Sequence, residues 1–434
     1  MVMNGLEQGY VLPKGNRVLR PILLAGYGRS GTSAVMKILA TDPHIVFDRS
    51  YPYEFRDLSY YAKLSQILAN RLPDERFTSN HLYLFEESVF GPWPWHGHNG
   101  GKDIDWLRIF WDLFSRNART ADQGARFYAE KAPMWLAPMV RPILPCFVIH
   151  LFRDPRDVYL SSNAFIKMRN YYSFHRTQED TDLDHARSLG LELVNYFENF
   201  IEDTGRYGDS FLLRYEELVT RPEAFVAWLR GIGLNPDIDS AFEGIEGHQT
   251  SPNLDASFRR WEREYVPPEV SSFFEQHLGR EMMMLGYPVE TAALCRQIEF
   301  RTGQPVPQVS DLAHGQIEIN DNAMNIQIAG NDFGILVPSE PIQAEDANEV
   351  WVSAAGNVGD HCSLYWRDAD SNFSESRSIH VNFVPGVHWR ILRFRTSQHP
   401  LWAGRIQQLR IDLFNGDSPQ TRGAGHVRWV RLIQ

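Results

Sequence analysis

The pattern of apolar and polar positions changes near residue 300. Before that point, short apolar runs such as residues 21–26 and 146–152 alternate with segments in which apolar residues recur every three to four positions. Continuous apolar runs are typical of strands covered on both faces, and the longer period is typical of amphipathic helices. This alternation predicts an α/β fold in three layers around a parallel sheet.

The expected elements follow from these patterns and from local start signals. Strands are expected at residues 21–26, 43–47, 125–130, 146–152 and 209–215. Helices are expected at residues 32–41, 54–70, 105–114 and 185–203, and another should begin after Asp154. Asp154 is a good N-cap and Pro155 suits the first helical position.

After residue 300 the apolar residues alternate with period two. Eight short segments show this pattern, from "QIEIN" to "HVRWVRLI", with turn residues between them. Such spacing predicts an all-β sandwich of the jelly-roll kind. The chain is therefore divided into an α/β domain at residues 1–300, a linker at 301–316 and a β-sandwich domain at 317–434.

Composition narrows the classes of partner. The 434 residues carry a formal net charge of −11, which argues against a nucleic-acid partner, because that affinity comes largely from neutralising phosphates. No apolar run reaches the roughly 18 residues of a membrane-spanning helix. The cysteines Cys146, Cys295 and Cys362 are odd in number and far apart, which favours a reducing compartment, so a cytoplasmic protein is expected.

The stretch "GYGRSGTS" at residues 26–33 predicts an anion site. Gly26 and Gly31 have the spacing of a nucleotide triphosphate loop, but Thr32 stands where that loop has its lysine. The cation is Arg29, inside the loop. A strand, a glycine turn and a helix start direct backbone N–H groups at an anion. Because a sulfuryl group carries less charge than a phosphoryl group, one or two fixed cations would suffice and no metal is required.

A second stretch, "HLFRDPRDVYLSSNAF" at residues 150–165, predicts a second phosphate site. Arg153 ends a predicted strand, and Ser161 lies further along the helix that follows. Together they could hold a separate phosphate. An ion pair of Arg153 with Asp154 or Asp157 is the alternative interpretation.

At these two stretches the chain resembles the sulfotransferases that use 3′-phosphoadenosine 5′-phosphosulfate as co-substrate, which have a P-loop-like fold. The resemblance implies that the 5′-phosphosulfate is bound by Arg29, Ser30, Gly31, Thr32 and Ser33. It implies that Arg153 and Ser161 bind the 3′-phosphate. "RYEEL" is similar to a third landmark and implies that Tyr215 contacts the adenine. "SFRRWERE" resembles a segment that closes over the co-substrate, with Ser257 and Arg260 as its candidates.

An acceptor hydroxyl must lose its proton during transfer, so a general base is expected. Cytosolic members of this family have a His in the stretch that matches "AEKAPMW", and none is present here. Lys131 in that stretch resembles the family's lysine that steadies the sulfuryl oxygens; a solvated lysine is the alternative. Glu54 resembles the base of the tyrosyl-protein members and is the first candidate, with Glu130 second. Glu54 could instead be an acid at a helix start.

Several other aromatic and histidine residues are candidates for ligand binding, but packing would also explain some of them. Trp93, Trp95, His96 and His98 lie in a Pro- and Gly-rich loop, and no metal site is predicted from this His pair. The final strands resemble carbohydrate-binding-like modules. Their tryptophans would stack on sugars or, as is more frequent, fill the sandwich core: Trp351, Trp366, Trp389 and Trp402.

These observations predict a sulfotransferase that moves a sulfuryl group to an acceptor hydroxyl, with a carbohydrate or other extended molecule as the candidate acceptor. Two alternatives stay open. One is a nucleotide-dependent kinase, which would need Mg²⁺ ligands. The other is a metal-independent, nucleotide-sensing glycan-binding protein without catalysis.

Overall fold

The computed structural model describes residues 18–50, 52–68, 105–241, 250–251, 254–289, 297–303, 305–308, 315–321, 323–330, 333–383, 386–415 and 422–434. Its contacts divide the chain into two compact units, each made of two segments. The first unit joins Met1–Glu179 to Phe200–Val266, and the second joins Asp180–Asn199 to Pro267–Gln434. This division differs from the expected boundaries at residues 300 and 316, because two helical segments are grouped with the sandwich.

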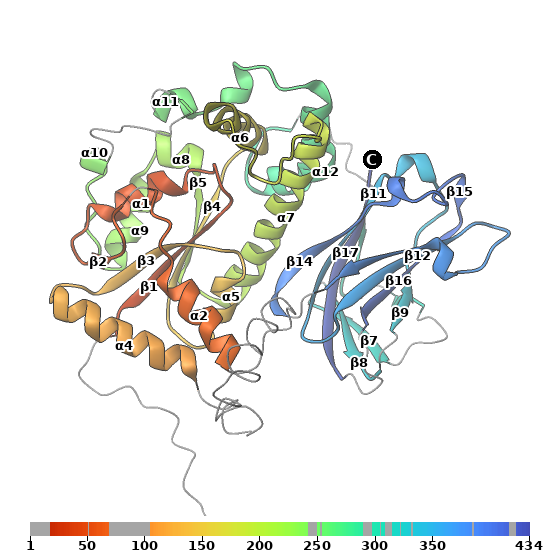
Figure 1. Cartoon of the computed structure of the whole chain (residues 1–434), viewed down its shortest axis with the longest axis horizontal. Helices are drawn as coiled ribbons and strands as arrows, with labels where there is room; N and C mark the ends of the chain where they lie inside the picture. The colour runs from red at the N-terminus through yellow and green to blue at the C-terminus, as the bar shows by residue number, and fades with distance from the viewer. Residues whose placement is uncertain are drawn as a thin grey trace, which may run out of the picture. The chain divides into compact units, whose positions relative to one another are not determined.

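The first unit is built on a five-stranded sheet of order β2-β3-β1-β4-β5 (Figure 1). Every pairing in it is parallel. The strands are β1 (Arg20–Gly26), β2 (Ile45–Val46), β3 (Phe127–Ala132), β4 (Phe147–Phe152) and β5 (Ser210–Arg214). They confirm the predicted parallel α/β sheet.

Helices cover both faces of this sheet. Ile22 and Leu24 of β1 pack in a core with α1 (Thr32–Ala40), α8 (Tyr215–Thr220) and α9 (Glu223–Gly231). Leu23 and Ala25, on the other face, pack with α2 (Asp57–Leu68), α4 (Trp106–Ala121) and α5 (Leu136–Val140). Because successive strand residues point to opposite faces, burial on both faces explains the continuous apolar runs. Further α-helices of this unit include α6 (Pro155–Arg169), α10 (Ile238–Ala241) and α11 (Leu254–Ser257).

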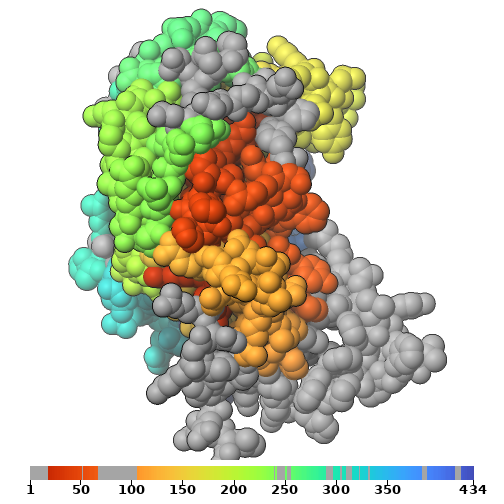
Figure 2. Space-filling view, turned by 90° about the vertical axis from the view of Figure 1, so that its left-hand side faces the viewer, coloured from red at the N-terminus to blue at the C-terminus, as the bar shows by residue number. Residues whose placement is uncertain are grey.

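One face of this unit is visible in Figure 2. The orange-red surface of the segment that follows β1 lies between the green surface of the segment that follows β5 and the orange surface of α4.

The carboxyl ends of parallel strands share one edge of a sheet, which is where α/β proteins bind ligands. The glycine loop (residues 27–31), Lys131, Arg153 and Tyr215 lie at or next to the carboxyl ends of β1, β3, β4 and β5.

The second unit contains antiparallel sheets, which confirms the predicted β-sandwich. One sheet has the order β14-β11-β17-β8-β7, with β6 paired to β17, and another has the order β13-β12-β16-β9. The first comprises β6 (Gln297–Glu299), β7 (Gly315–Asn320), β8 (Ala323–Ile328), β11 (Glu349–Gly356), β14 (Gly386–Phe394) and β17 (Gly423–Ile433). The second comprises β9 (Gly334–Leu336), β12 (His361–Arg367), β13 (Ser378–Asn382) and β16 (Gln408–Asn415). The short strands β10 (Ile342–Gln343) and β15 (Arg405–Ile406) pair with each other.

Two helices of the second unit contact the larger sheet. They are α12 (Pro268–Met284) and the part of α7 (Asp182–Arg206) that ends at Asn199. Arg431 of β17 is fully buried and donates to Glu281 of α12 at 2.6 Å. The Trp429 indole donates to Glu198 of α7 at 3.0 Å, and the Ile391 N–H donates to Asn195 at 2.6 Å. These buried polar contacts fix the helices on the sheet.

The four sandwich tryptophans are buried. Trp366 and Trp402 belong to the sandwich core, while Trp351 has its ring 6.4 Å from that of Phe273 on α12. Trp389 packs with two alanines and lies under the Arg428 guanidinium. Packing therefore accounts for all four, and none presents an open ring face for a sugar. Among the described residues no helix has the length and apolarity of a membrane span.

Candidate active site

The glycine loop connects β1 to α1 and has an unusual backbone. Arg29 and Gly31 have φ angles of 69° and 102°, in the left-handed region. A Cβ atom at Gly31 would lie 2.3 Å from the Tyr215 ring, so only glycine fits there. Ser30 is fully buried and its Oγ has no hydrogen-bond partner among the described residues. The turn therefore packs tightly on α8 and keeps a polar atom available inside it.

The Arg29 side chain connects the glycine loop to the second predicted phosphate motif. Its Nε donates to Ser161 Oγ at 3.3 Å, and one terminal nitrogen donates to Thr250 Oγ1 at 3.3 Å. The guanidinium carbon lies 4.6 Å from the centre of the Phe165 ring. Ser161 and Phe165 are both on α6, four residues apart and hence on one helical face. Arg29 thus contacts the residue predicted for the second phosphate.

Arg153 lies immediately after β4 and is buried. It donates to the Arg29 carbonyl at 3.0 Å and to Asp157 Oδ2 at 3.4 Å, and it also donates to the Ser257 carbonyl. Its Nε atom has no partner among the described residues. The ion pair with Asp157 was one of the two sequence interpretations, but it uses only part of the guanidinium group.

Tyr215 and Ser257 form the next contact of this group. The Tyr215 hydroxyl lies 2.5 Å from Ser257 Oγ, and the Arg153 guanidinium carbon lies 4.7 Å from the centre of the Tyr215 ring. Arg260 donates to Glu264 at 2.6 and 2.7 Å through two nitrogens, and to Thr250 Oγ1 at 3.4 Å through a third. Residues from three predicted motifs therefore meet at the carboxyl ends of β4 and β5.

A second group of predicted residues surrounds Lys131 on β3. The Lys131 ammonium donates to Ser33 Oγ at 2.9 Å, to the Pro52 carbonyl at 2.6 Å and to Glu54 Oε1 at 2.8 Å. Thr32 is the first residue of α1 and Ser33 the second. Lys131 therefore connects the start of the helix after the glycine loop to the segment that carries Glu54.

Burial and charge act in opposite directions on this pair. Burial lowers the pKa of Lys131, and the hydrogen bond and charge of Glu54 partly restore it. For Glu54 burial raises the pKa, but the hydrogen bond and charge of Lys131, followed by Arg56, outweigh it and hold the pKa below 4.5. The Glu54 carboxyl group is therefore ionised at neutral pH. Glu54 is also more exposed, with 47% of its side chain accessible against 8% for Lys131.

Glu130, the second candidate base, lies on the opposite face of β3 from Lys131. Its carboxyl group accepts hydrogen bonds from the Leu58 and Ser59 N–H groups at 3.0 and 3.2 Å, and from the Ser59 and Tyr128 hydroxyls. Burial raises its pKa to about 7 despite these donors. Glu130 on β3 thus bonds the first turn of α2. This contact fixes the position of the segment before α2, which carries Glu54.

The structure brings most of the predicted residues into two adjoining groups and also adds Thr250, which no motif includes. Thr250 bonds Arg29 and Arg260, and Asp157 joins Arg153 to the Trp261 N–H at 2.9 Å. Asp157 has a recognisable position, one helical turn after Arg153. Nothing in the sequence distinguishes Thr250. Trp93, Trp95, His96 and His98 lie outside the described residues.

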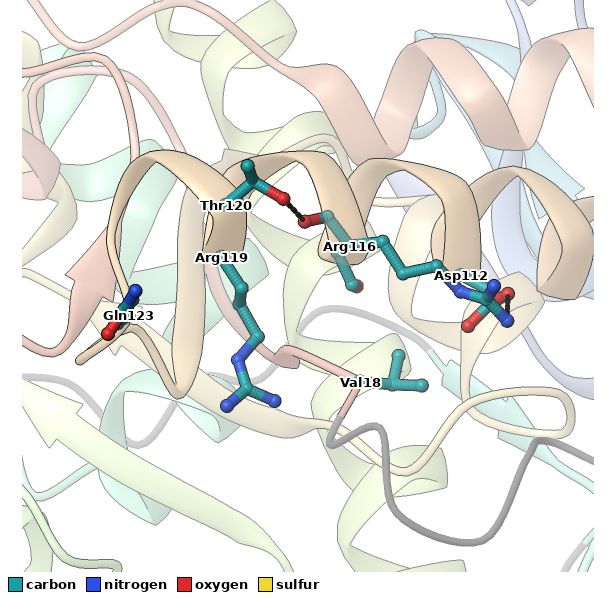
Figure 3. Close-up of a pocket in the computed structure, with 7 residues that line it drawn as sticks. Val18, Asp112, Arg116, Arg119, Thr120 and Gln123 are labelled. Atoms are coloured by element: carbon teal, nitrogen blue, oxygen red, sulfur yellow. Dashed lines mark hydrogen bonds and ion pairs between the residues drawn. The ribbon is translucent and has the colours of Figure 1, made fainter.

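Two features of the described residues bear on other ligands. No group of three or more His, Cys, Asp or Glu residues is arranged to hold a metal ion within the described ranges. A cavity of about 480 Å³ lies beside α4 (Figure 3). It is lined by Val18, Asp112, Ser115, Arg116, Arg119, Thr120 and Gln123. None of the predicted site residues lines this cavity.

The family of the first region follows from comparison with known proteins. The model of the sulfotransferase family matches residues 21–230, which include the glycine loop, Arg153 and Tyr215. The match covers just under half of the 434 residues. No curated protein matches the chain.

Solved structures give more remote likenesses to both regions. A sulfotransferase domain from the curacin biosynthetic pathway is 12% identical with a TM-score of 0.33, covering 63% of this chain and 99% of that one. A low-affinity xylan-binding module, CBM86 from Roseburia intestinalis, is 16% identical with a TM-score of 0.23, covering 32% and 96%. A family 29 carbohydrate-binding module from Piromyces equi is 8% identical with a TM-score of 0.24, covering 32% and 91%.

Proposed function

We propose that this protein transfers a sulfuryl group from 3′-phosphoadenosine 5′-phosphosulfate to an acceptor hydroxyl without a metal ion. The observation that carries the proposal is the contact between the two predicted anion motifs. Arg29 donates to Ser161, and Arg153 donates to the Arg29 carbonyl at 3.0 Å. A donor with phosphates at two positions of one nucleoside needs two anion sites that adjoin, as these do.

The roles of the remaining residues follow from their positions. Ser30, Gly31, Thr32 and Ser33 would bind the 5′-phosphosulfate at the start of α1, where N–H groups and the helix dipole favour an anion. Arg153 and Ser161 would bind the 3′-phosphate. Tyr215, Ser257 and Arg260 would enclose the adenosine.

The chemical step needs a charge donor and a base. The acceptor oxygen attacks sulfur and its proton passes to the Glu54 carboxylate, while the bond between sulfur and the phosphate oxygen breaks and adenosine 3′,5′-bisphosphate leaves. Arg29 and Lys131 would stabilise the charge that develops on the transferring group and the leaving oxygen. Lys131 holds Glu54 ionised, which keeps this carboxylate able to accept a proton.

The acceptor class and the compartment are also part of the proposal. We favour a carbohydrate or another extended hydroxyl-bearing acceptor. Cys146 and Cys362 are both free and buried, which supports a reducing compartment such as the cytoplasm.

The test uses the full chain, radiolabelled sulfate donor and pools of glycan and small-alcohol acceptors, with and without a metal chelator. Sulfation that survives the chelator is expected. Phosphorylation from ATP that the chelator abolishes would favour a kinase. Nucleotide binding without transfer to any pool would favour a nucleotide-sensing glycan-binding protein.

A binding experiment tests the second anion site. Arg153→Ala should weaken adenosine 3′,5′-bisphosphate by about 10-fold or more and leave adenosine 5′-monophosphate nearly unchanged, since a hydrogen bond to a charged group contributes roughly 1.5–3 kcal/mol. Calorimetric titration measures both affinities. Equal losses for the two ligands would reject the assignment of Arg153 to the 3′-phosphate.

A further inference from the structure

The Thr250 hydroxyl lies where the residues of three predicted motifs converge. Its Oγ1 accepts hydrogen bonds from Arg29 at 3.3 Å and from Arg260 at 3.4 Å, and it lies 3.1 Å from Ser161 Oγ. These three residues come from the glycine loop, from the closing segment and from α6. No motif of the sequence includes Thr250.

The number of donors around this oxygen atom is informative. A threonine hydroxyl has two acceptor lone pairs and one proton to donate. With both lone pairs occupied by the two guanidinium groups, the Thr250 proton is the one left for the contact with Ser161 Oγ. Thr250 therefore holds two cationic groups on a single neutral atom, and its own proton is engaged by Ser161.

Electrostatics favours an anion at this place. The Glu264 carboxylate offsets the charge of Arg260, while the acceptor that Arg260 shares with Arg29 is a neutral hydroxyl, which compensates little of the repulsion between two guanidinium groups. A phosphate dianion would bond both groups through charge-assisted hydrogen bonds, which are stronger than those to a hydroxyl. An independent observation agrees: the buried Nε atom of Arg153 has no partner among the described residues. Arg153 bonds the Arg29 carbonyl directly, so it belongs to the same group.

We infer that Thr250 is a positioning residue for the 3′-phosphate, which sets the spacing of Arg29 and Arg260. The inference rests on the proposed function and adds to it. It assigns specificity for a 3′-phosphorylated nucleotide to a residue outside the recognised motifs. It also gives Arg29 a part in 3′-phosphate binding, in addition to its place in the glycine loop.

The experiment compares Thr250→Val, which removes the hydroxyl and keeps the shape, with Thr250→Ser, which keeps the hydroxyl. Thr250→Val should weaken adenosine 3′,5′-bisphosphate about 10-fold and leave adenosine 5′-monophosphate within about twofold, the scale of one hydrogen bond to a charged group. Thr250→Ser should stay within about threefold of the parent chain for both ligands. In turnover, Thr250→Val should raise KM for the donor while kcat changes little.

Thr204→Val is the matched control, because Thr204 is exposed on α7 and its hydroxyl bonds only the Phe200 and Ile201 carbonyls. It should leave both affinities unchanged. The inference is overturned if Thr250→Val binds both nucleotides as the parent does, or loses both equally. If the parent chain itself does not prefer the 3′-phosphorylated nucleotide, the proposed function fails together with the inference. If the parent chain and the Thr250→Val variant prefer the 3′-phosphorylated nucleotide equally, only the role of Thr250 is rejected.

Discussion

Lys131 uses all three of its N–H donors in the structure, on Ser33, the Pro52 carbonyl and Glu54. An ammonium group has no fourth donor, so contact with a sulfuryl oxygen requires one of these bonds to be exchanged. Glu54 is the partner that can leave at the lowest cost, because it is half-exposed and water can solvate it. Binding of the sulfate donor would then break the bond between Lys131 and Glu54. The Glu54 carboxylate that is set free is the group that takes the proton from the acceptor hydroxyl.

Replacing Glu54 tests this coupling. Glu54→Gln removes the base and should lower kcat by about 10²–10⁴-fold, the range of general acid–base catalysis. Because Lys131 and Arg56 hold the pKa of Glu54 below 4.5, the parent enzyme should keep its rate as the pH falls from 7 to 5. Steady-state rates across that range measure both effects. Glu217→Gln on α8, which breaks the ion pair with Arg214 at the end of β5, is the control. A Glu54→Gln rate within about threefold of the parent would show that another group is the base.

Arg29 is expected to act mainly in the transition state. Arg29→Ala should lower kcat by about 10²-fold or more, the scale of losing one preorganised charge donor. Arg29→Lys keeps the charge but lacks the planar guanidinium group that bonds both Ser161 and Thr250. It should therefore recover only part of the rate. Single-turnover kinetics with saturating donor separate binding from chemistry. If Arg29→Ala raised only KM for the donor, Arg29 would be a uniform binding residue.

At the scale of elements, the packing of the glycine loop on α8 depends on Gly31. A side chain there would meet the Tyr215 ring at 2.3 Å and would also require the φ angle of 102°. Gly31→Ala should therefore destabilise the fold by about 1–3 kcal/mol and impair nucleotide binding, since strain at such positions is of that order. Urea unfolding and calorimetric titration measure the two effects.

Gly205→Ala on α7 is the control for that substitution, because a Cβ atom at Gly205 meets nothing within 4 Å. It should be neutral or should stabilise the helix by about 0.5–1 kcal/mol. Equal effects of the two substitutions would show that the close approach of Gly31 to Tyr215 does not matter.

The elements themselves were largely predictable, because each depends on local residues. The apolar runs of β1 and β4 and the Asp154-Pro155 start of α6 needed no tertiary information. Thr250 could not be predicted, because its contact with Arg29 joins residues 221 positions apart and threonine has no local signal for that role. The same holds for the contact of Glu130, whose carboxyl group reaches α2 from β3.

At the scale of the whole molecule, the break in composition near residue 300 suggested a separately folded sandwich. In the second unit, however, segments that precede residue 300 bond the sandwich. Glu198 of α7 bonds both Trp429 and Arg428 of β17, at 3.0 and 2.5 Å. Glu281 of α12 bonds Arg431, and β6 pairs with β17 although it precedes residue 300. Buried charged groups of the helical segments therefore pair with buried charged groups of the sandwich. Without one part, the groups of the other part would lose their partners.

A chain that ends at Glu299 tests this arrangement. It would lack β17 and leave Glu198, Asn195 and Glu281 without their partners from the sandwich. Breaking a buried ion pair by removing one partner costs about 3–5 kcal/mol, a large part of the stability of a whole domain. We expect the shortened chain to be insoluble or to unfold without a cooperative transition, as judged by soluble yield and by urea unfolding. The full chain with Arg431→Met, which removes only one partner of Glu281, should be soluble but less stable by a similar amount. If the shortened chain instead folds cooperatively and binds adenosine 3′,5′-bisphosphate as the full chain does, the sandwich is an independent module, and its effect on large and small acceptors can then be compared directly.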